Sequence, residues 1–475
     1  MKKQLIKLRI IGWMMGVSTL IMLGCSSLRH ELFQSSAWDL GIFDQAIYLI
    51  SQGQSPISSF LGFHILGDHA AIVLYPLALL YKIYPTVYWL LVVQAIALTL
   101  AALFINYLAR QAGLTARQAT TIATAYLLYP LVFNINLYDF HPEVIALPAL
   151  FGAILAARLK KISWFCFSIF LVLGCKAVLS LTVAAMGFWL LVFEKKRLCG
   201  AIALLSGIAW FAIATKAIIP FFGGEAASVA RHLSRYSHFG NSFIAIAQNL
   251  LLQPNLVLGK IFSLATLEYL ALLIAPVLWG ISPRYLLPLV GAIPTLTLNI
   301  LANATQQRNL VHQYSLPILP FLFVAVMQAF ASRYAWIQKP RAIILWSLVA
   351  FLALGKYGYF WTIYLDSLDT WQATRKAIAL VQTKGGVYTT AEIAPHLTHR
   401  PLIKFTDANS PPVDLTKFEY ILLNVRHPGW LSNEDFATNL VNQLKRTEVF
   451  QLNYQHDDVY LFVKNSSGEK SKKLL

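Results

Sequence analysis

Long apolar runs separated by short polar stretches make up the chain as far as about residue 361. A helix needs about 20 apolar residues to cross a bilayer, and runs of this kind begin near residues 10, 87, 119, 142, 162, 177, 199, 262, 285, 316 and 342. One more run, at 70–85, is shorter and contains Pro76, Lys82 and Pro85. The pattern predicts an α-helical polytopic membrane protein with about eleven transmembrane helices and a helix at 70–85 that lies in the membrane interface.

The pattern changes after residue 361, where no further run is long enough to span a membrane. Short apolar runs at 386–390, 402–405 and 420–425 read as strands, as do two runs near the end. A helical pattern at 370–383 precedes the first strand, and another at 433–445 lies between the third strand and the last two. We therefore expect a transmembrane domain at 1–361, a small α/β soluble domain at 362–464 and a disordered tail at 465–475.

Composition supports the membrane assignment. The chain is 57% apolar and only 12% charged, with a mean hydropathy of +0.59. These values exclude a water-soluble enzyme, a disordered chain and a disulfide-rich secreted domain. The net charge of +17 comes from basic residues in short clusters between apolar runs, rather than on one soluble face. We therefore expect the lipid bilayer as a partner and no nucleic acid.

The basic clusters also predict the orientation, because cytoplasmic loops are enriched in Lys and Arg. With the N-terminus in the cytoplasm, sixteen basic residues lie on the inner side: Lys2, Lys3, Lys7, Arg9, Arg110, Arg117, Arg158, Lys160, Lys161, Lys195, Lys196, Arg197, Arg284, Arg333, Lys339 and Arg341. The longer outer loops hold seven: Arg29, Lys82, Lys176, Arg231, Arg235, Lys260 and Arg308. We expect a cytoplasmic N-terminus and an extracytoplasmic C-terminal domain.

Acidic residues are scarce in the first 361 positions and gather on the outer side. Six of the nine fall between residues 31 and 143: Glu31, Asp39, Asp44, Asp68, Asp139 and Glu143. Acids near a bilayer must be solvated or paired, so their convergence on one face is a functional hypothesis. The alternative is that they are ordinary polar loop residues at a water boundary.

The first acidic motif is WDLGIFDQ, which contains Asp39 and Asp44. On a helix, a separation of five residues points the two carboxylates about 140° apart, so they would not chelate one ion together. One can face a substrate while the other anchors the loop, and Asp39 can also cap a helix that begins after it. Asp68 and His69, in LGDH, adjoin the expected interfacial helix.

The second acidic motif is NLYDFHPE, with Asp139, His141 and Glu143 at alternating positions. Such spacing can place three groups on one face of an extended segment, as metal and phosphate sites require. Asp and His at a helix start are also common caps, so a divalent metal is weakly specified and no cofactor is assigned.

Cationic and aromatic candidates lie near the outer ends of later spans. Lys176 follows an apolar run and either pairs with a carboxylate, binds an anion or extends to the surface. Arg308, His312 and Tyr314 lie in QQRNLVHQYSLP, where Arg308 and His312, one helical turn apart, suit a phosphate. The stretch with Arg231, His232, Arg235 and His238 suits phosphate or anionic lipid heads.

The succession WDLGIFDQ, LGDH, YDFHPE, a lysine after the next short span and HQYSLPILP resembles a bacterial family of multispanning membrane proteins of unknown function. That family is similar to the GT-C glycosyltransferases, which take sugars from polyprenyl-phosphate carriers at the outer membrane face. The resemblance implies a GT-C-like fold in the bacterial inner membrane. One departure stands out: this chain has Lys176-Ala177-Val178 where the family tends to have Lys-Glu-Asp, which places metal dependence and activity in doubt.

The resemblance implies a membrane glycosyltransferase that uses a polyprenyl-phosphate-linked sugar. Asp39, Asp44, Asp139, His141 and Glu143 become the candidate catalytic residues, with Asp39 preferred as the acceptor-activating carboxylate. The candidate substrate- or phosphate-binding residues are Asp68, His69, Lys176, Arg308, His312 and Tyr314. Two alternatives remain: a transporter or flippase of a lipid-linked or anionic substrate, and a catalytically silent scaffold.

Overall fold

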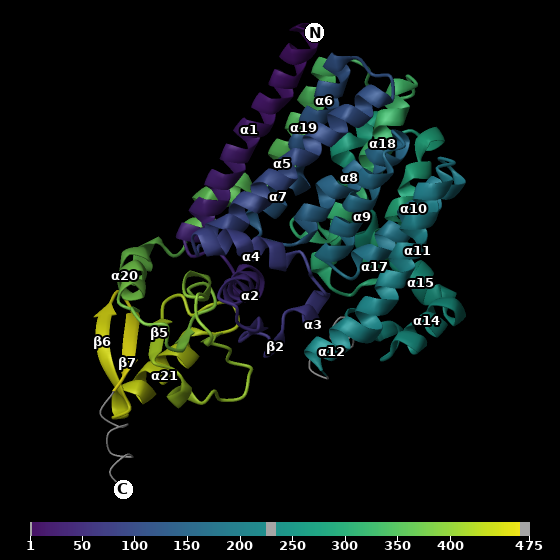
Figure 1. The fold of residues 1–475 in the computed structure, drawn as a ribbon. Coiled ribbons are helices and arrows are strands. Elements are labelled where there is room, and N and C mark those ends of the chain that lie inside the picture. The colour runs from purple at the N-terminus through teal and green to yellow at the C-terminus, as the bar shows by residue number, and fades with distance from the viewer. Residues whose placement is uncertain (1, 225–233, 466–475) are drawn as a thin grey trace. The chain divides into compact units, whose positions relative to one another are not determined.

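The computed structural model describes residues 2–224 and 234–465. It divides into two compact units (Figure 1). The helical unit comprises Met1–Cys25, Leu66–Val73 and Leu90–Tyr357, and the mixed unit comprises Ser26–Ile65, Leu74–Trp89 and Gly358–Leu475. Arg231, His232 and most of the expected tail lie outside the described residues.

Every long apolar run identified before residue 361 forms helix. The longer helices of the helical unit follow the chain as α1 (Lys2–Glu31, which continues into the mixed unit), α5 (Tyr88–Gln111), α6 (Ala116–Leu127), α7 (Pro130–Leu137), α8 (Glu143–Arg158), α9 (Ile162–Cys175), α10 (Leu179–Val192), α11 (Arg197–Ile213), α14 (Phe243–Leu252), α15 (Pro254–Ile261), α16 (Leu264–Ile274), α17 (Ile293–Leu301), α18 (Leu319–Ala331) and α19 (Pro340–Leu354). Two short helices, α3 (Leu66–His69) and α12 (Ile219–Gly223), also belong to it.

Judged by helix length, fewer helices can span a membrane than the sequence predicts. In the part of the chain that the structure describes, four helices are long and apolar enough to cross a membrane: Arg9–Glu31, Tyr88–Gln111, Arg197–Gly223 and Gln313–Ala331. Two pairs of helices bent by 47° and 42° raise this to six. Helices α8, α9 and α10 have only 14–16 residues, about 21–24 Å, against a hydrocarbon core of about 30 Å. A polytopic helical protein is thus confirmed, but the count of eleven is not.

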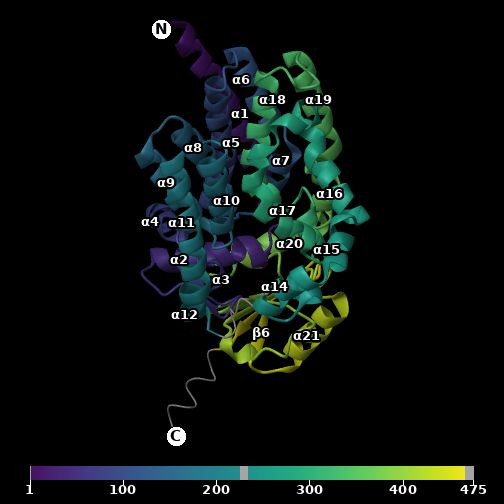
Figure 2. The same cartoon turned by 90° about the vertical axis from the view of Figure 1, so that its right-hand side faces the viewer.

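Helices α8 to α11 pack side by side in sequence order (Figure 1). Helices α10 and α11 approach most closely at glycines: a Cβ on Gly187 would lie 2.2 Å from the backbone nitrogen of Leu204. Any larger residue at Gly187 would separate the two helices. On another side of the unit, α6 packs against α19, and α18 against α8 (Figure 2).

The mixed unit contains a five-stranded sheet built from the strands that the sequence predicts. Its strands are β3 (Val387–Thr389), β4 (Ile403–Phe405), β5 (Tyr420–Asn424), β6 (Phe450–His456) and β7 (Val459–Lys464), in the order β4-β3-β5-β7-β6. The pairs of β3 with β4 and β5 are parallel, and the remaining pairs are antiparallel. The expected helices are α20 (Leu368–Ala379) and α21 (Glu434–Arg446).

The side chains of β5 alternate between the two faces of the sheet, and a helix covers each face. Tyr420 and Leu422 point to the face covered by α20, whereas Ile421 and Leu423 point to the face covered by α21. Figure 2 shows α21 alongside β6, which it contacts. The central strands β3 and β5 are therefore buried on both faces between the two helices, whereas the edge strand β6 is largely exposed.

The segment after α1 also belongs to the mixed unit. It forms a short π-helix, η1 (Ala37–Gly41), then α2 (Ile42–Ser51), the hairpin β1 (Ile57–Ser58) and β2 (Phe63–His64), and α4 (Leu74–Ile83). Phe33 and Ala37 lie in the same apolar core as α20 and β3, and the Ala37 amide donates to the Ala391 carbonyl at 3.2 Å. The sequence did not predict that this loop folds with the C-terminal strands.

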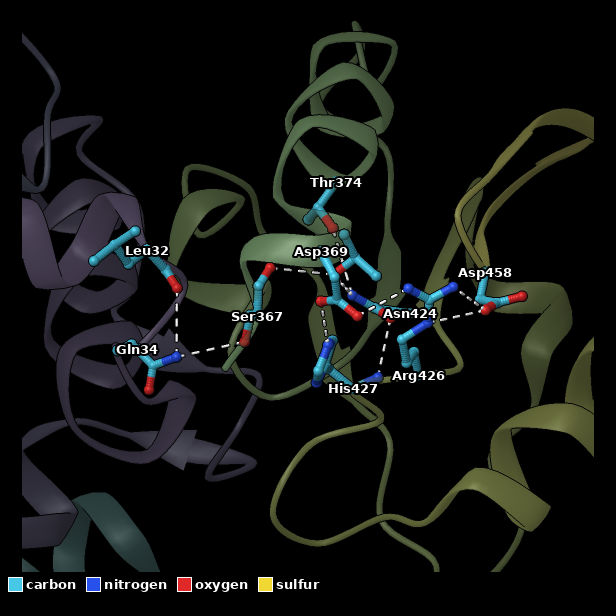
Figure 3. Close-up of polar contacts among 10 residues, drawn as sticks. Leu32, Gln34, Ser367, Asp369, Thr374, Asn424, Arg426, His427 and Asp458 are labelled. Carbon is cyan, nitrogen blue, oxygen red and sulfur yellow. Dashed lines mark hydrogen bonds and ion pairs between the residues drawn. The ribbon is translucent and has the colours of Figure 1, made fainter. Parts of the chain in front are cut away.

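A polar cluster closes one side of the mixed unit (Figure 3). The Arg426 guanidinium bridges Asp369, at 2.8 Å, and Asp458, at 2.7 Å, and His427 contacts the same Asp369 carboxylate at 2.7 Å. Partial burial of Asp369 acts to raise its pKa, but the hydrogen bonds from Arg426 and His427 outweigh this effect and lower the pKa of Asp369. Because these groups are largely exposed, their ion pairs contribute little to the stability of the mixed unit. Their main effect is to orient α20 against β5 and β7.

Acidification is expected to weaken the mixed unit through His396. Its ring stacks on His30 at 4.0 Å, and its Nε2 atom is buried without a hydrogen-bond partner among the described residues. Burial lowers the pKa of His396 to about 4, although the carboxylate of Glu31 acts in the opposite direction. An unfolded histidine titrates near 6.5, so the unfolded chain takes up this proton first. Stability should therefore fall as the pH drops from about 6.5 to about 4, by up to about 3 kcal/mol.

The measurement is the melting temperature of the full chain in detergent at neutral pH and at several acidic values down to the pKa of His396. A His396→Gln variant lacks this titrating group, so its melting temperature should change less over the same interval. Equal declines in both proteins would contradict the assignment.

Candidate functional site

The candidate residues fall into two groups in the structure. Asp68, His69, Asp139, His141, Glu143, Lys176, Arg308, His312 and Tyr314 belong to the helical unit, and Asp39 and Asp44 belong to the mixed unit. The expected convergence of Asp39 and Asp44 with the second acidic motif therefore stays a prediction. Within the helical unit, several motifs that are distant in sequence do meet.

Two backbone hydrogen bonds join the LGDH segment to the loop that carries Lys176. The Ala177 amide donates to the His69 carbonyl, and the Val73 amide donates to the Gly174 carbonyl, both at 2.9 Å. On its other side, Gly67 lies so close to α12 that a Cβ there would be 2.5 Å from the Cα of Gly223. These contacts fix Asp68 and His69 beside Lys176.

Lys176 forms a buried ion pair with Glu143. Glu143 begins α8 directly after Pro142, and Lys176 follows the last residue of α9 in an extended conformation. Its Nζ lies 2.6 Å from the Glu143 Oε1 atom, and the two side chains are only 11% and 5% exposed. The second carboxylate oxygen of Glu143, Oε2, is buried without a hydrogen-bond partner among the described residues. The pair therefore keeps a charged lysine in an enclosed place and leaves one acceptor oxygen for a ligand.

A cavity of about 240 Å³ opens at this pair. Five candidate residues from the sequence line it: Asp68, His69, Glu143, Lys176 and Tyr314. The carboxylate of Asp68 lies 3.3 Å from the Nε2 atom of its neighbour His69. A cation, two carboxylates, an imidazole and a phenol thus surround one space, as an ionic substrate headgroup would require.

Arg235 adds a second cation to the cavity. Its guanidinium lies over the ring of Tyr314, 5.2 Å from the ring centre, and its carbonyl accepts from the Asn303 amide at 2.9 Å. The sequence had placed Arg235 only in a basic outer stretch. The cavity is also lined by amide side chains that the sequence missed, Asn299, Gln307 and Gln313. Isolated amides in apolar surroundings carry no motif that would have identified them.

The second acidic motif meets the HQY motif through aromatic rings. The Tyr138 ring stacks near His141, at 5.6 Å, and contacts the ring of His312 edge-on at 4.1 Å. His312 in turn lies 6.4 Å from Tyr314, a cavity residue. Asp139 is buried and has a φ of +95°, which is strained for a residue with a side chain. These ring contacts connect the second acidic motif and the HQY motif to Tyr314, which lines the cavity.

Arg308 does not line the cavity. It ends a short 3₁₀ helix at Thr305–Arg308, and the next residue, Asn309, is extended. The Asn309 side chain accepts a hydrogen bond from the His312 amide at 3.1 Å. Arg308 and His312 therefore do not share a helical turn, contrary to the spacing argument, because the helix stops between them.

Asp44 is fully buried in the mixed unit. Its carboxylate accepts hydrogen bonds from the hydroxyls of Tyr81 and Thr398 and lies 3.2 Å from the Nε2 atom of His399. Asp44 thereby joins α2 to α4 and to the loop before β4. Asp39 lies in η1, whose N-cap is Ser36 rather than Asp39. Of the two acids in WDLGIFDQ, Asp44 thus has the contacts of an anchoring residue.

No group of three or more His, Cys, Asp or Glu side chains is arranged to hold a metal ion within residues 2–224 and 234–465.

The fold is similar to that of a solved glycosyltransferase. ArnT from Cupriavidus metallidurans, crystallised with undecaprenyl phosphate, superposes with a TM-score of 0.55 at 12% sequence identity, over 96% of this chain and 98% of that chain. The apo form of ArnT gives the same identity and coverage with a TM-score of 0.44. ArnT is a GT-C glycosyltransferase, and this chain has an ArnT-like fold.

The chain belongs to the family of predicted membrane proteins designated DUF2079, whose profile matches residues 29–461. This confirms the resemblance drawn from its motifs. A search of curated proteins finds no significant match.

Proposed function

We propose that this protein transfers a glycosyl group from a polyprenyl-phosphate-linked donor to an acceptor hydroxyl at the outer face of the bacterial inner membrane. The observation that carries the proposal is the cavity in the helical unit, where Lys176, held by Glu143, and Arg235 present two cations to one enclosed space. The ArnT-like fold supports the same class of reaction.

The cavity suits the headgroup of such a donor. Its volume of about 240 Å³ lies below the roughly 300–1,000 Å³ of sites that enclose a whole drug-sized ligand. A sugar phosphate would occupy it while the prenyl chain stays among apolar helices. In this assignment Lys176 and Arg235, rather than Arg308, contact the phosphate, because among the described Lys and Arg residues these two line the cavity.

The proposed reaction breaks the bond between the sugar and the phosphate oxygen. Negative charge grows on the departing lipid phosphate, and fixed cations stabilise it most strongly where water is excluded. A carboxylate accepts the proton of the acceptor hydroxyl as the new bond forms. We assign this role to Asp39, with Asp68 as the competing carboxylate because it lines the cavity.

The test is deletion of the gene followed by mass spectrometry of envelope glycans and prenyl-linked sugars. A transferase predicts that one glycan modification disappears while its prenyl-phosphate sugar accumulates in the outer leaflet, open to a membrane-impermeant hydrolase. Accumulation in the inner leaflet would instead identify a flippase. Unchanged glycans and unchanged prenyl-linked sugars would reject both functions and leave the scaffold.

A further inference from the structure

The mixed unit contains a groove of about 800 Å³ that the proposed chemistry does not use. Aromatic side chains from three parts of the unit line it: Trp38 from η1, Phe60 from the β1–β2 turn, and Tyr388, Phe405 and Phe418 from the sheet region. Trp38, Phe60 and Phe405 are only partly buried, although the unit has a packed core. Aromatic faces left open in a groove mark a place for a ligand.

The rings form a corner rather than a flat patch. The Trp38 ring stands at 74° to the Phe405 ring, with centres 5.8 Å apart, and the Phe60 ring is tilted by 36° at 5.9 Å. Mutual packing at these distances holds the planes in place before any ligand arrives. A rigid molecule with flat apolar faces would therefore bind at little cost in side-chain entropy.

Charged residues at the same groove divide into two kinds. The carboxylates shape the loop: Asp407 accepts from the Asn409 amide at 2.9 Å and from the Ser410 hydroxyl at 2.7 Å, and Asp414 caps a short helix. Lys404 is exposed and forms no ion pair with any described residue. The groove thus offers aromatic planes beside a free ammonium group, a combination that a purely hydrocarbon ligand would not need.

We propose that this groove binds a saccharide, which is the acceptor of the transferred glycosyl group. A sugar ring has one apolar C–H face that packs on an aromatic plane and a rim of hydroxyls that takes hydrogen bonds from Lys404. The assignment rests on the proposed function, because Trp38 directly precedes Asp39, the proposed acceptor-activating carboxylate, so the groove and that residue share the short element η1.

The experiment measures binding of soluble oligosaccharides to the full chain in detergent, without any donor. Chitotetraose, maltotetraose and a hyaluronan tetrasaccharide are the probes, followed by saturation-transfer NMR at millimolar concentration. At least one should bind, and Trp38→Ala should weaken it about tenfold or more, whereas Trp38→Phe, which keeps an aromatic plane, should weaken it less. Trp430→Ala is the matched control, since Trp430 is 59% exposed and lies outside the groove.

Lys404→Ala provides a second variant that leaves the packed rings untouched and should also weaken binding. The proposal fails if no probe binds, if Trp38→Ala and Lys404→Ala bind as the wild type does, or if farnesol displaces the saccharide. The two proposals fail separately: saccharide binding without glycosyl transfer rejects the function, and transfer without saccharide binding rejects the groove.

Discussion

Replacing Lys176 by methionine is expected to destabilise the helical unit and to weaken binding of the lipid carrier. The change leaves the Glu143 carboxylate, 5% exposed, without its partner at 2.6 Å. Removing one member of a buried ion pair costs about 3–5 kcal/mol, because the remaining charge is neither solvated nor paired. The same change removes the ammonium group that we assign to the donor phosphate.

A double variant separates these two effects. Lys176→Met combined with Glu143→Gln removes both charges, so stability should return to within about 1 kcal/mol of the wild type. Carrier binding should not return, because a charge-assisted contact worth about 1.5–3 kcal/mol is still missing, roughly ten- to a hundredfold in affinity. Melting temperature and binding of undecaprenyl phosphate by native mass spectrometry measure the two quantities.

Lys82→Met is the control for Lys176→Met, because Lys82 is exposed on α4 and makes no ion pair among the described residues. It should change neither stability nor binding. If the double variant binds the carrier as tightly as the wild type, Lys176 does not hold the phosphate.

Replacing Asp39 by asparagine is expected to reduce glycosyl transfer by about 10²- to 10⁴-fold, the usual contribution of a general base. Asparagine keeps the volume and the hydrogen-bonding shape of the side chain but cannot take up a proton at neutral pH. Carrier binding should remain, since we assign it to Lys176 and Arg235. The fold should also remain, because the cap of η1 is Ser36.

Asp44→Asn is the contrasting variant in the same motif. Asp44 is fully buried and joins Tyr81, Thr398 and His399, so its loss should lower the melting temperature of the mixed unit. Transfer per folded molecule should change much less than in Asp39→Asn. Undiminished transfer by Asp39→Asn would reject Asp39 as the base, and loss of transfer in Asp68→Asn would then assign the role to Asp68.

The C-terminal strands could be predicted from the local pattern of apolar residues. The runs at 386–390, 402–405 and 420–425 predict β3, β4 and β5 within one or two residues, and the nearly uninterrupted apolar run of β5 follows from its burial on both faces. The number of spans was less predictable. Hydropathy locates apolar runs, but proline breaks, as at Pro130 between α6 and α7, divide them into helices shorter than a membrane.

The candidate site was likewise only partly predictable from the sequence. Motif position alone identified Asp68, His69, Glu143, Lys176 and Tyr314 as candidates, and all five line the cavity. It could not pair Glu143 with Lys176, nor add Arg235, Gln307 and Gln313, since those contacts cross several helices. It preferred Asp39 to Asp44 as the catalytic acid, but only burial shows Asp44 to be an anchor.

The sequence by itself determined the class of this protein, its helical and strand segments and the motifs that carry its charges, because hydropathy, alternation and residue type act over a few neighbouring positions. Only the tertiary structure decided which charges meet. The Glu143–Lys176 pair joins residues 33 positions apart and depends on where α8 begins and α9 ends, and the backbone bond from the Ala177 amide to the His69 carbonyl brings in a third segment. Such pairings follow from the packing of whole helices, which no local pattern encodes.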